Sequence, residues 1–185
     1  MPSLLEKAGE LGLLSISVPE ALGGMGMDFK TTLLATEALG GSHSFSVAFG
    51  AHTGIGTLPL LYYGTEEQKA KYIPKLASGE WKASYCLTEP GSGSDAAALV
   101  SSARKTNEGY RLNGTKAFTS GGGFSDLYIV MARSGGDGPK GISAFLVENG
   151  KEGLSFGKKE QKMGWKAQPT AQVELTDCLV DNEDL

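Results

Sequence analysis

The spacing of apolar residues changes once along the chain, near Trp81. Before Trp81, apolar residues recur at intervals of three and four, as at Leu4 and Ala8, which is the period of an amphipathic helix. After Trp81, apolar and polar residues alternate in short runs bounded by glycine and proline, which is typical of strands. We therefore expect an α+β protein with an N-terminal helical domain at residues 1–82 and an antiparallel β-barrel or sandwich domain at residues 83–185.

Capping and turn residues mark the ends of the predicted helices. Gly12 can end the first helix, and Asp28 can cap the second. Thr65–Gln68 has the pattern of a capping box, and we expect Pro74 to disturb the end of the helix that follows it. The stretch Ser44–Leu61 is apolar and rich in small residues, which predicts a helix packed closely on its neighbours.

The second half carries a strong turn signal and several short apolar runs. Asn113-Gly114 is the preferred pair for a two-residue turn, and it predicts a hairpin between Tyr110–Leu112 and Thr115–Phe118. Four further strands are expected over the runs Leu127–Ala132, Ile142–Val147, Gly153–Gly157 and Thr170–Leu175.

Composition argues against several classes of protein. The 185 residues carry a net charge of −4, so no basic footprint for nucleic acid is present. No apolar stretch approaches the roughly 20 residues that a membrane span needs, and no secretory signal is visible at the start. Two cysteines cannot form a disulfide framework, so a reducing compartment is expected. With two histidines and no Cys/His cluster, no metal site is expected, and His43 and His52 are assigned core or surface roles.

The segment Tyr85–Asp95 carries the richest candidate chemistry. A strand that ends at Thr88 is followed by a loop of glycine and serine, in which glycines allow a close approach of the backbone to a ligand. Free N–H groups and the hydroxyls of Ser92 and Ser94 could surround a phosphate, and Thr88 could bond the edge of a heterocycle. An ordinary strand-to-loop turn is the more common explanation of such a segment when it is taken alone.

Several segments together resemble the acyl-CoA dehydrogenase family. The sequence TEPGSGSD at Thr88–Asp95, after a strand with an aromatic residue, is similar to the flavin-binding signature of that family. Later matches follow in the same order, at Leu112–Gly121, Lys140–Val147, Gly153–Glu160 and Gly164–Cys178. Upstream matches to the helical N-terminal domain are Leu11–Leu13, Pro19, Gly23-Gly24 and Tyr63–Lys69. The resemblance covers nearly the whole chain.

This resemblance implies FAD as the cofactor and assigns residues to it. The expected contacts are Tyr85, Cys86, Leu87, Thr88, Gly93, Ser94, Phe118, Thr119 and Ser120. Thr88 and nearby backbone groups would bond the pyrimidine edge, and Ser120 would lie near flavin N5. Ser94 would lie where FAD and the acyl-CoA substrate come close, so it is also a candidate for substrate binding. Gly121 stands where the family frequently has asparagine, so the resemblance does not predict the conformation of that turn.

The implied reaction is α,β-dehydrogenation of an acyl-CoA thioester. A carboxylate removes the α proton, a hydride passes from the β carbon to flavin N5, and electron-transfer flavoprotein is the expected electron acceptor. The glutamate that acts as base in the family lies in a C-terminal helical bundle that is absent from this chain, so no catalytic residue is expected here. Glu89 is expected to be structural. The chain alone is expected to be inactive.

The resemblance also implies a setting, and it leaves alternatives open. A homo-oligomer, dimer or tetramer, is expected, in the cytoplasm of a bacterium or the mitochondrial matrix of a eukaryote. An acyl-CoA oxidase shares the scaffold, and a non-catalytic module that binds acyl-CoA or FAD is a third possibility. The acyl chain is open, since Leu112–Gly121 and Ser155–Thr170 resemble isobutyryl-CoA and short-chain members, whereas Ala51–Gly56 is closer to long-chain bacterial ones.

Overall fold

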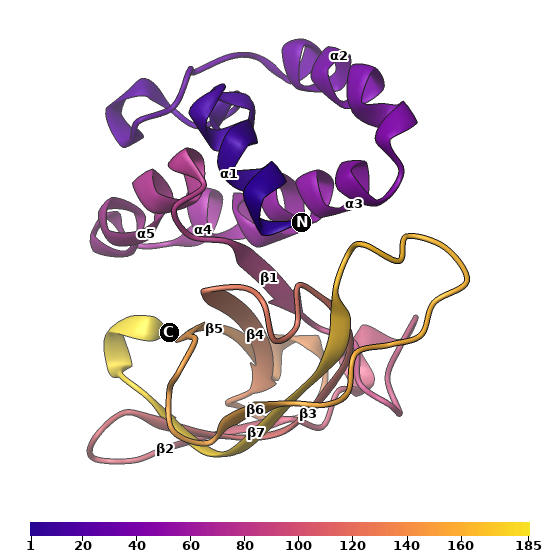
Figure 1. The fold of residues 1–185 in the computed structure, drawn as a ribbon. Coiled ribbons are helices and arrows are strands. Elements are labelled where there is room, and N and C mark those ends of the chain that lie inside the picture. The colour runs from indigo at the N-terminus through magenta and orange to yellow at the C-terminus, as the bar shows by residue number, and fades with distance from the viewer. The chain divides into compact units, whose positions relative to one another are not determined.

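A computed structural model describes residues 1–185, apart from the side chain of Pro2. The chain divides into two compact units, which Figure 1 shows as a group of helices and a curled sheet. The first unit comprises residues 1–83 and 161–168, and the second comprises residues 84–160 and 169–185. A short piece from late in the chain therefore belongs with the helices. Among the described residues, no helix is both long enough and apolar enough to span a membrane.

The first unit is built from α-helices joined by short turns. Its helices are α1 (Pro2–Glu10), α2 (Phe29–Leu39), α3 (Ser44–Gly50), α4 (Leu58–Tyr63) and α5 (Glu66–Ser78). Single 3-10 turns lie at Leu13–Ser15, Glu20–Leu22 and Gly40–Ser42, and a π-helical turn at Ala51–Gly56 joins α3 to α4.

The predicted caps of these helices are confirmed. Gly12, just beyond the end of α1, adopts a left-handed φ of 76°. The Asp28 carboxylate accepts a hydrogen bond from the Thr31 N–H at 2.9 Å, and both halves of the box between Thr65 and Gln68 are formed. The expectation for Pro74 is wrong. The helix α5 continues through Pro74 to Ser78, although proline has no N–H to donate within the helix. Gly79 ends the helix with a φ of 76°.

The stretch predicted as one helix from Ser44 to Leu61 is helical, but a π turn divides it. That wide turn carries His52, whose side chain is 2 % exposed. Its Nδ1 accepts a hydrogen bond from the Ala83 N–H at 3.1 Å, so its Nε2 carries the proton and donates to the Leu76 carbonyl at 2.9 Å. His52 therefore joins the end of α5 to the chain that leaves the helices, and its expected structural role is confirmed.

The second unit is a seven-stranded curled sheet, which Figure 1 shows as a set of arrows labelled β1 to β7. Its strands are β1 (Ala83–Cys86), β2 (Ser102–Lys105), β3 (Tyr110–Ser120), β4 (Leu127–Arg133), β5 (Ile142–Glu148), β6 (Leu154–Phe156) and β7 (Thr170–Val180). They follow the order β1-β4-β2-β3-β7-β6, with β5 paired to β4. The predicted succession of helical and β domains is confirmed, and one parallel contact, Ser102 with Arg133, makes the sheet mixed.

The core of the sheet comes from alternate residues of the central strands. Buried apolar side chains from β3, β4, β5 and β7 form one cluster, which includes Leu112, Tyr128, Phe145 and Val173. The longest pairing in the sheet joins β3 to β7 in antiparallel register, from Tyr110 opposite Val180 to Ser120 opposite Thr170. The site described below is built on β3.

The predicted hairpin at Asn113-Gly114 is wrong, because β3 runs unbroken through both residues. Gly114 has a φ of 150°, far from the left-handed helical value that a two-residue turn requires. The pairing shifts register between Leu112 and Gly114, which marks a bulge instead of a turn. Glycine is needed here for space, since a Cβ would lie 2.6 Å from the Cβ of Ser101.

Replacing Gly114 by alanine is expected to destabilise the protein by about 1–3 kcal/mol, through strain at positive φ and the clash with Ser101. Gly136→Ala is the matched control, because nothing lies within 4 Å of a Cβ there. Urea unfolding of both variants measures the difference in free energy. Equal stabilities of the two variants would contradict the close approach of Gly114 to Ser101.

Candidate functional site

The two segments expected to bind flavin lie side by side in the second unit. The first follows β1, and the second forms the end of β3. The Ala117 N–H donates to the Thr88 carbonyl at 2.7 Å, and the Ser84 hydroxyl donates to the Ser120 carbonyl at 2.6 Å. Residues far apart in the chain are thereby held in contact over the length that the resemblance assigned to one ligand.

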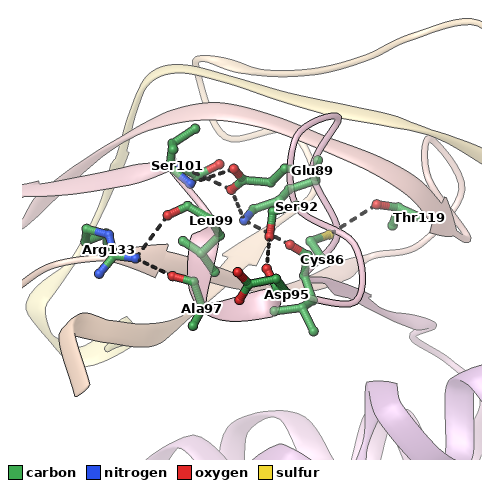
Figure 2. A network of polar contacts seen from close by, with 12 residues as sticks. Cys86, Glu89, Ser92, Asp95, Ala97, Leu99, Ser101, Thr119 and Arg133 are labelled. Atoms are coloured by element: carbon green, nitrogen blue, oxygen red, sulfur yellow. Dashed lines mark hydrogen bonds and ion pairs between the residues drawn. The ribbon is translucent and has the colours of Figure 1, made fainter. Parts of the chain in front are cut away.

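Strand geometry divides the predicted contact residues into two sets. Cys86 and Thr119 are buried, and the Thr119 hydroxyl points to the Cys86 sulfur at 3.7 Å (Figure 2). Their side chains face the core, so only their backbone groups are placed to meet a ligand. The side chains of Tyr85, Leu87 and Ser120, which alternate with them, are partly exposed, and so is that of Thr88 beyond the end of β1.

Phe118 projects from the surface of the second unit. Its side chain is 67 % exposed, and its φ is 55°, a value uncommon for a bulky residue. A register shift between Lys116 and Thr119 surrounds it, and its extra residue lies in β3, so this bulge turns the aromatic ring outward. An aromatic ring that points outward offers a flat apolar surface against which a planar ligand can pack.

The glycine-rich loop after β1 is open in the way an anion-binding loop requires. Gly93 and Ser94 are exposed, and a Cβ added at Gly91 or Gly93 would meet nothing within 4 Å. Among the described residues, the N–H groups of Gly93 and Ser94 have no acceptor. Such free N–H groups could receive a phosphate or another anion.

Ser92 does not serve the predicted purpose. Its side chain is 3 % exposed, and its hydroxyl donates to the Asp95 carbonyl at 2.7 Å, as Figure 2 shows. The backbones of Ser92 and Glu89 also bond each other in both directions. Ser92 therefore closes the loop from within, and Ser94 carries the exposed hydroxyl of the pair.

Glu89 is buried beneath this loop, with 4 % of its surface exposed. Its carboxylate accepts hydrogen bonds from the Val100 N–H at 2.7 Å and the Ser101 N–H at 3.0 Å, and it pairs with the Lys116 ammonium at 2.6 Å. Burial acts to raise the pKa of Glu89, but the bonds from Lys116 and the backbone outweigh it, and the pKa lies below its usual value. Both oxygens of this carboxylate are thus occupied in holding the structure.

Lys116 is the partner that the sequence analysis missed. Its side chain is fully buried on β3, and its ammonium also donates to the Leu87 carbonyl at 3.3 Å. Burial lowers its pKa, and the Glu89 carboxylate opposes that shift. A sequence signal did exist, because alternation along β3 places Lys116 on the same face as the buried Leu112, where an ammonium requires a carboxylate.

Arg133 fixes the far side of the same loop. Its guanidinium donates to the carbonyls of Ala97 at 2.8 Å and Leu99 at 3.1 Å, which Figure 2 shows, and to those of Gly136 and Gly138 at 2.8 and 2.9 Å. Two charged side chains therefore hold the chain after the glycine-rich loop. The Glu89 carboxylate accepts hydrogen bonds from its N–H groups, and the Arg133 guanidinium donates to its carbonyls. Among the described residues, no group of three metal-ligating side chains comes together.

Comparisons with known proteins agree with this arrangement. The profile "Acyl-CoA dehydrogenase, N-terminal domain" matches residues 1–80, and "Acyl-CoA dehydrogenase, middle domain" matches residues 84–178. The mitochondrial isobutyryl-CoA dehydrogenase of Bos taurus is 47% identical over 176 residues, which are 95% of this chain and 42% of the relative. An acyl-CoA dehydrogenase of Bacillus subtilis (strain 168) is 45% identical over 184 residues, 98% of this chain and 48% of the relative.

A solved structure matches the whole chain. The crystal structure of an acyl-CoA dehydrogenase complexed with FAD from Bacillus anthracis has a TM-score of 0.94 and 44% sequence identity, over 100% of this chain and 32% of that one. The present chain thus spans less than half the length of each of these three proteins.

Neither thiol is expected to react in the folded protein. Cys86 and Cys178 are free and buried, and burial raises the pKa of Cys86 to about 12 and that of Cys178 above its usual value. Titration with a disulfide reagent at pH 8 should give no thiol in buffer and both in denaturant. Rapid reaction of either thiol in buffer would contradict the burial of these side chains.

The Glu89–Lys116 pair should behave as one unit in a double-mutant cycle. Glu89→Gln or Lys116→Met alone leaves one buried polar group without its partner and should destabilise the protein by about 3–5 kcal/mol. The double variant should be destabilised by less than the sum, because no unpaired charge remains. Urea unfolding of the four proteins measures the coupling, and strictly additive effects would show that the pair does not form.

Proposed function

Because the chain belongs to the acyl-CoA dehydrogenase family, we propose that it forms the flavin-binding part of an enzyme that dehydrogenates an acyl-CoA thioester between its α and β carbons. The observation that carries this proposal is the contact between the Thr88 segment and the end of β3, beside an open loop with free N–H groups. A planar polar ring joined to phosphates matches both features. FAD is such a molecule.

The residues present fit FAD. Neither the hydroxyl nor the N–H of Thr88 has an acceptor among the described residues, so both are available to the edge of a heterocycle. The exposed ring of Phe118 would pack on the ring system, and the Ser120 hydroxyl would lie near its reactive centre. Ser94 and the Gly93 N–H would bind phosphate, and Ser94 is also our candidate for contact with the substrate. The backbone at Tyr85, Cys86, Leu87 and Thr119 completes the proposed set.

The chain's own part in the reaction is to bind and orient. FAD, when bound, supplies the acceptor for a hydride. Glu89 is unsuited to remove the α proton, because its carboxylate is buried and accepts three hydrogen bonds. We therefore propose no catalytic residue in this chain, and we place the base in the portion of the family fold that these residues do not span.

The proposed electron acceptor, assembly and cellular location are taken from the family. Electron-transfer flavoprotein is the proposed electron acceptor, and the proposed assembly is a homo-oligomer. The proposed location is the cytoplasm of a bacterium or the mitochondrial matrix of a eukaryote. The 47% identity to an isobutyryl-CoA dehydrogenase supports including branched thioesters among the substrates to be tested.

Binding of FAD can be tested on this chain directly. A fluorescence titration should show tight binding by the unaltered protein, and Thr88→Val should weaken it about tenfold by removing a hydrogen bond of about 1–1.5 kcal/mol. The matched control is Thr176→Val, an exposed threonine on β7, which should bind FAD as the unaltered protein does. Absence of FAD binding would refute the proposal.

The reaction is tested on the intact gene product. Anaerobic addition of acyl-CoA thioesters of graded length, straight and branched, should bleach the flavin absorbance. Rapid oxygen consumption by the reduced enzyme would indicate an oxidase instead. A protein that binds FAD but is bleached by no acyl-CoA would be a binding module.

A further inference from the structure

We propose that Lys116 is a positioning residue that tunes the flavin through the peptide bond between Leu87 and Thr88. Its ammonium, held by Glu89, donates to the Leu87 carbonyl and so strengthens the Thr88 N–H as a hydrogen-bond donor. The inference rests on the proposed function, because it takes Thr88 as the residue at the pyrimidine edge of FAD.

The geometry places the charge at one end of a single peptide unit. The Leu87 carbonyl and the Thr88 N–H belong to the same planar amide, in which electron density is shared between oxygen and nitrogen. An ammonium 3.3 Å from that oxygen draws density toward it and leaves the N–H more acidic. The next carbonyl, of Thr88, is fixed by the Ala117 N–H at 2.7 Å, so β3 holds the peptide units on both sides of Thr88.

Burial strengthens the effect of the Lys116 ammonium on this peptide unit. Lys116 has no exposed side-chain surface, and Glu89 has 3%, so solvent screens their fields weakly. Glu89 keeps the ammonium in place at 2.6 Å, and it accepts its other hydrogen bonds from the N–H groups of Val100 and Ser101. The lysine therefore faces the ligand segment, and the glutamate links it to the loop.

The consequence for a bound flavin is a change in reduction potential. Reduction adds electron density to the pyrimidine edge, and a stronger N–H donor at that edge stabilises the reduced form more than the oxidised form. Lys116 should thus raise the potential. A role limited to holding the fold would change stability and leave the potential of the folded, FAD-loaded protein where it was.

The test compares Lys116→Met with Arg133→Met. Arg133 holds the same loop through the carbonyls of Ala97 and Leu99, so its loss disturbs the structure without touching the amide of Thr88. In the FAD-free protein, the Thr88 amide nitrogen resonance should move to lower frequency in Lys116→Met and stay in place in Arg133→Met. Lys116→Arg, which keeps a cation, should restore most of the shift.

The FAD-loaded proteins give the second measurement. Dye-coupled reduction should show a potential lower by about 30 mV in Lys116→Met, equivalent to a tenfold change in a two-electron equilibrium. If Lys116→Met does not fold, the double variant Glu89→Gln with Lys116→Met removes both charges and should show the same direction.

Two failures are distinguishable. Equal potentials and equal Thr88 resonances in Lys116→Met and Arg133→Met overturn the inference and leave FAD binding untouched. An unaltered protein that takes no FAD overturns the proposed function, and the Thr88 resonance then decides alone whether Lys116 polarises this amide.

Discussion

The buried ion pair between Lys116 and Glu89 is the interaction on which the site depends. Burying two charges is unfavourable unless each finds enough partners, and here both do. The carboxylate also accepts hydrogen bonds from two backbone N–H groups, and the ammonium also donates one to the Leu87 carbonyl. Since the pair joins β3 to the segment after β1 and to the chain after the glycine-rich loop, one interaction sets the relative position of three pieces.

The irregular pairing of β3 with β7 also shapes the site. A regular strand paired along its whole length with β7 would alternate strictly. The pairing shifts register twice, and only the second shift has its extra residue in β3 and interrupts the alternation of that strand. The first lies where Gly114 passes close to Ser101, and the second turns Phe118 outward between buried neighbours. The strand thus supplies core residues at most positions and a single exposed aromatic ring where the proposed ligand lies.

The sequence predicted elements well where local chemistry decides them, and failed where tertiary contacts do. Asp28 and Thr65 bond their own helix starts, so their caps could be recognised from a few residues. Asn113-Gly114 has the local preference for a turn, but pairing with β7 on both sides keeps β3 extended. Likewise, packing of Ile73 and Leu76 against the rest of the first unit carries α5 through Pro74.

The candidate site was predicted as contiguous runs, and strand geometry refines that picture. Family resemblance assigns neighbouring residues to one ligand, whereas successive side chains of an extended segment point to opposite faces. Cys86 and Thr119 therefore meet each other in the core, and Tyr85, Leu87 and Ser120 stay accessible. Lys116 stood outside the predicted set because a lysine in a strand is usually solvated. Its role follows only from the carboxylate that the fold places beneath the loop, which no local pattern contains.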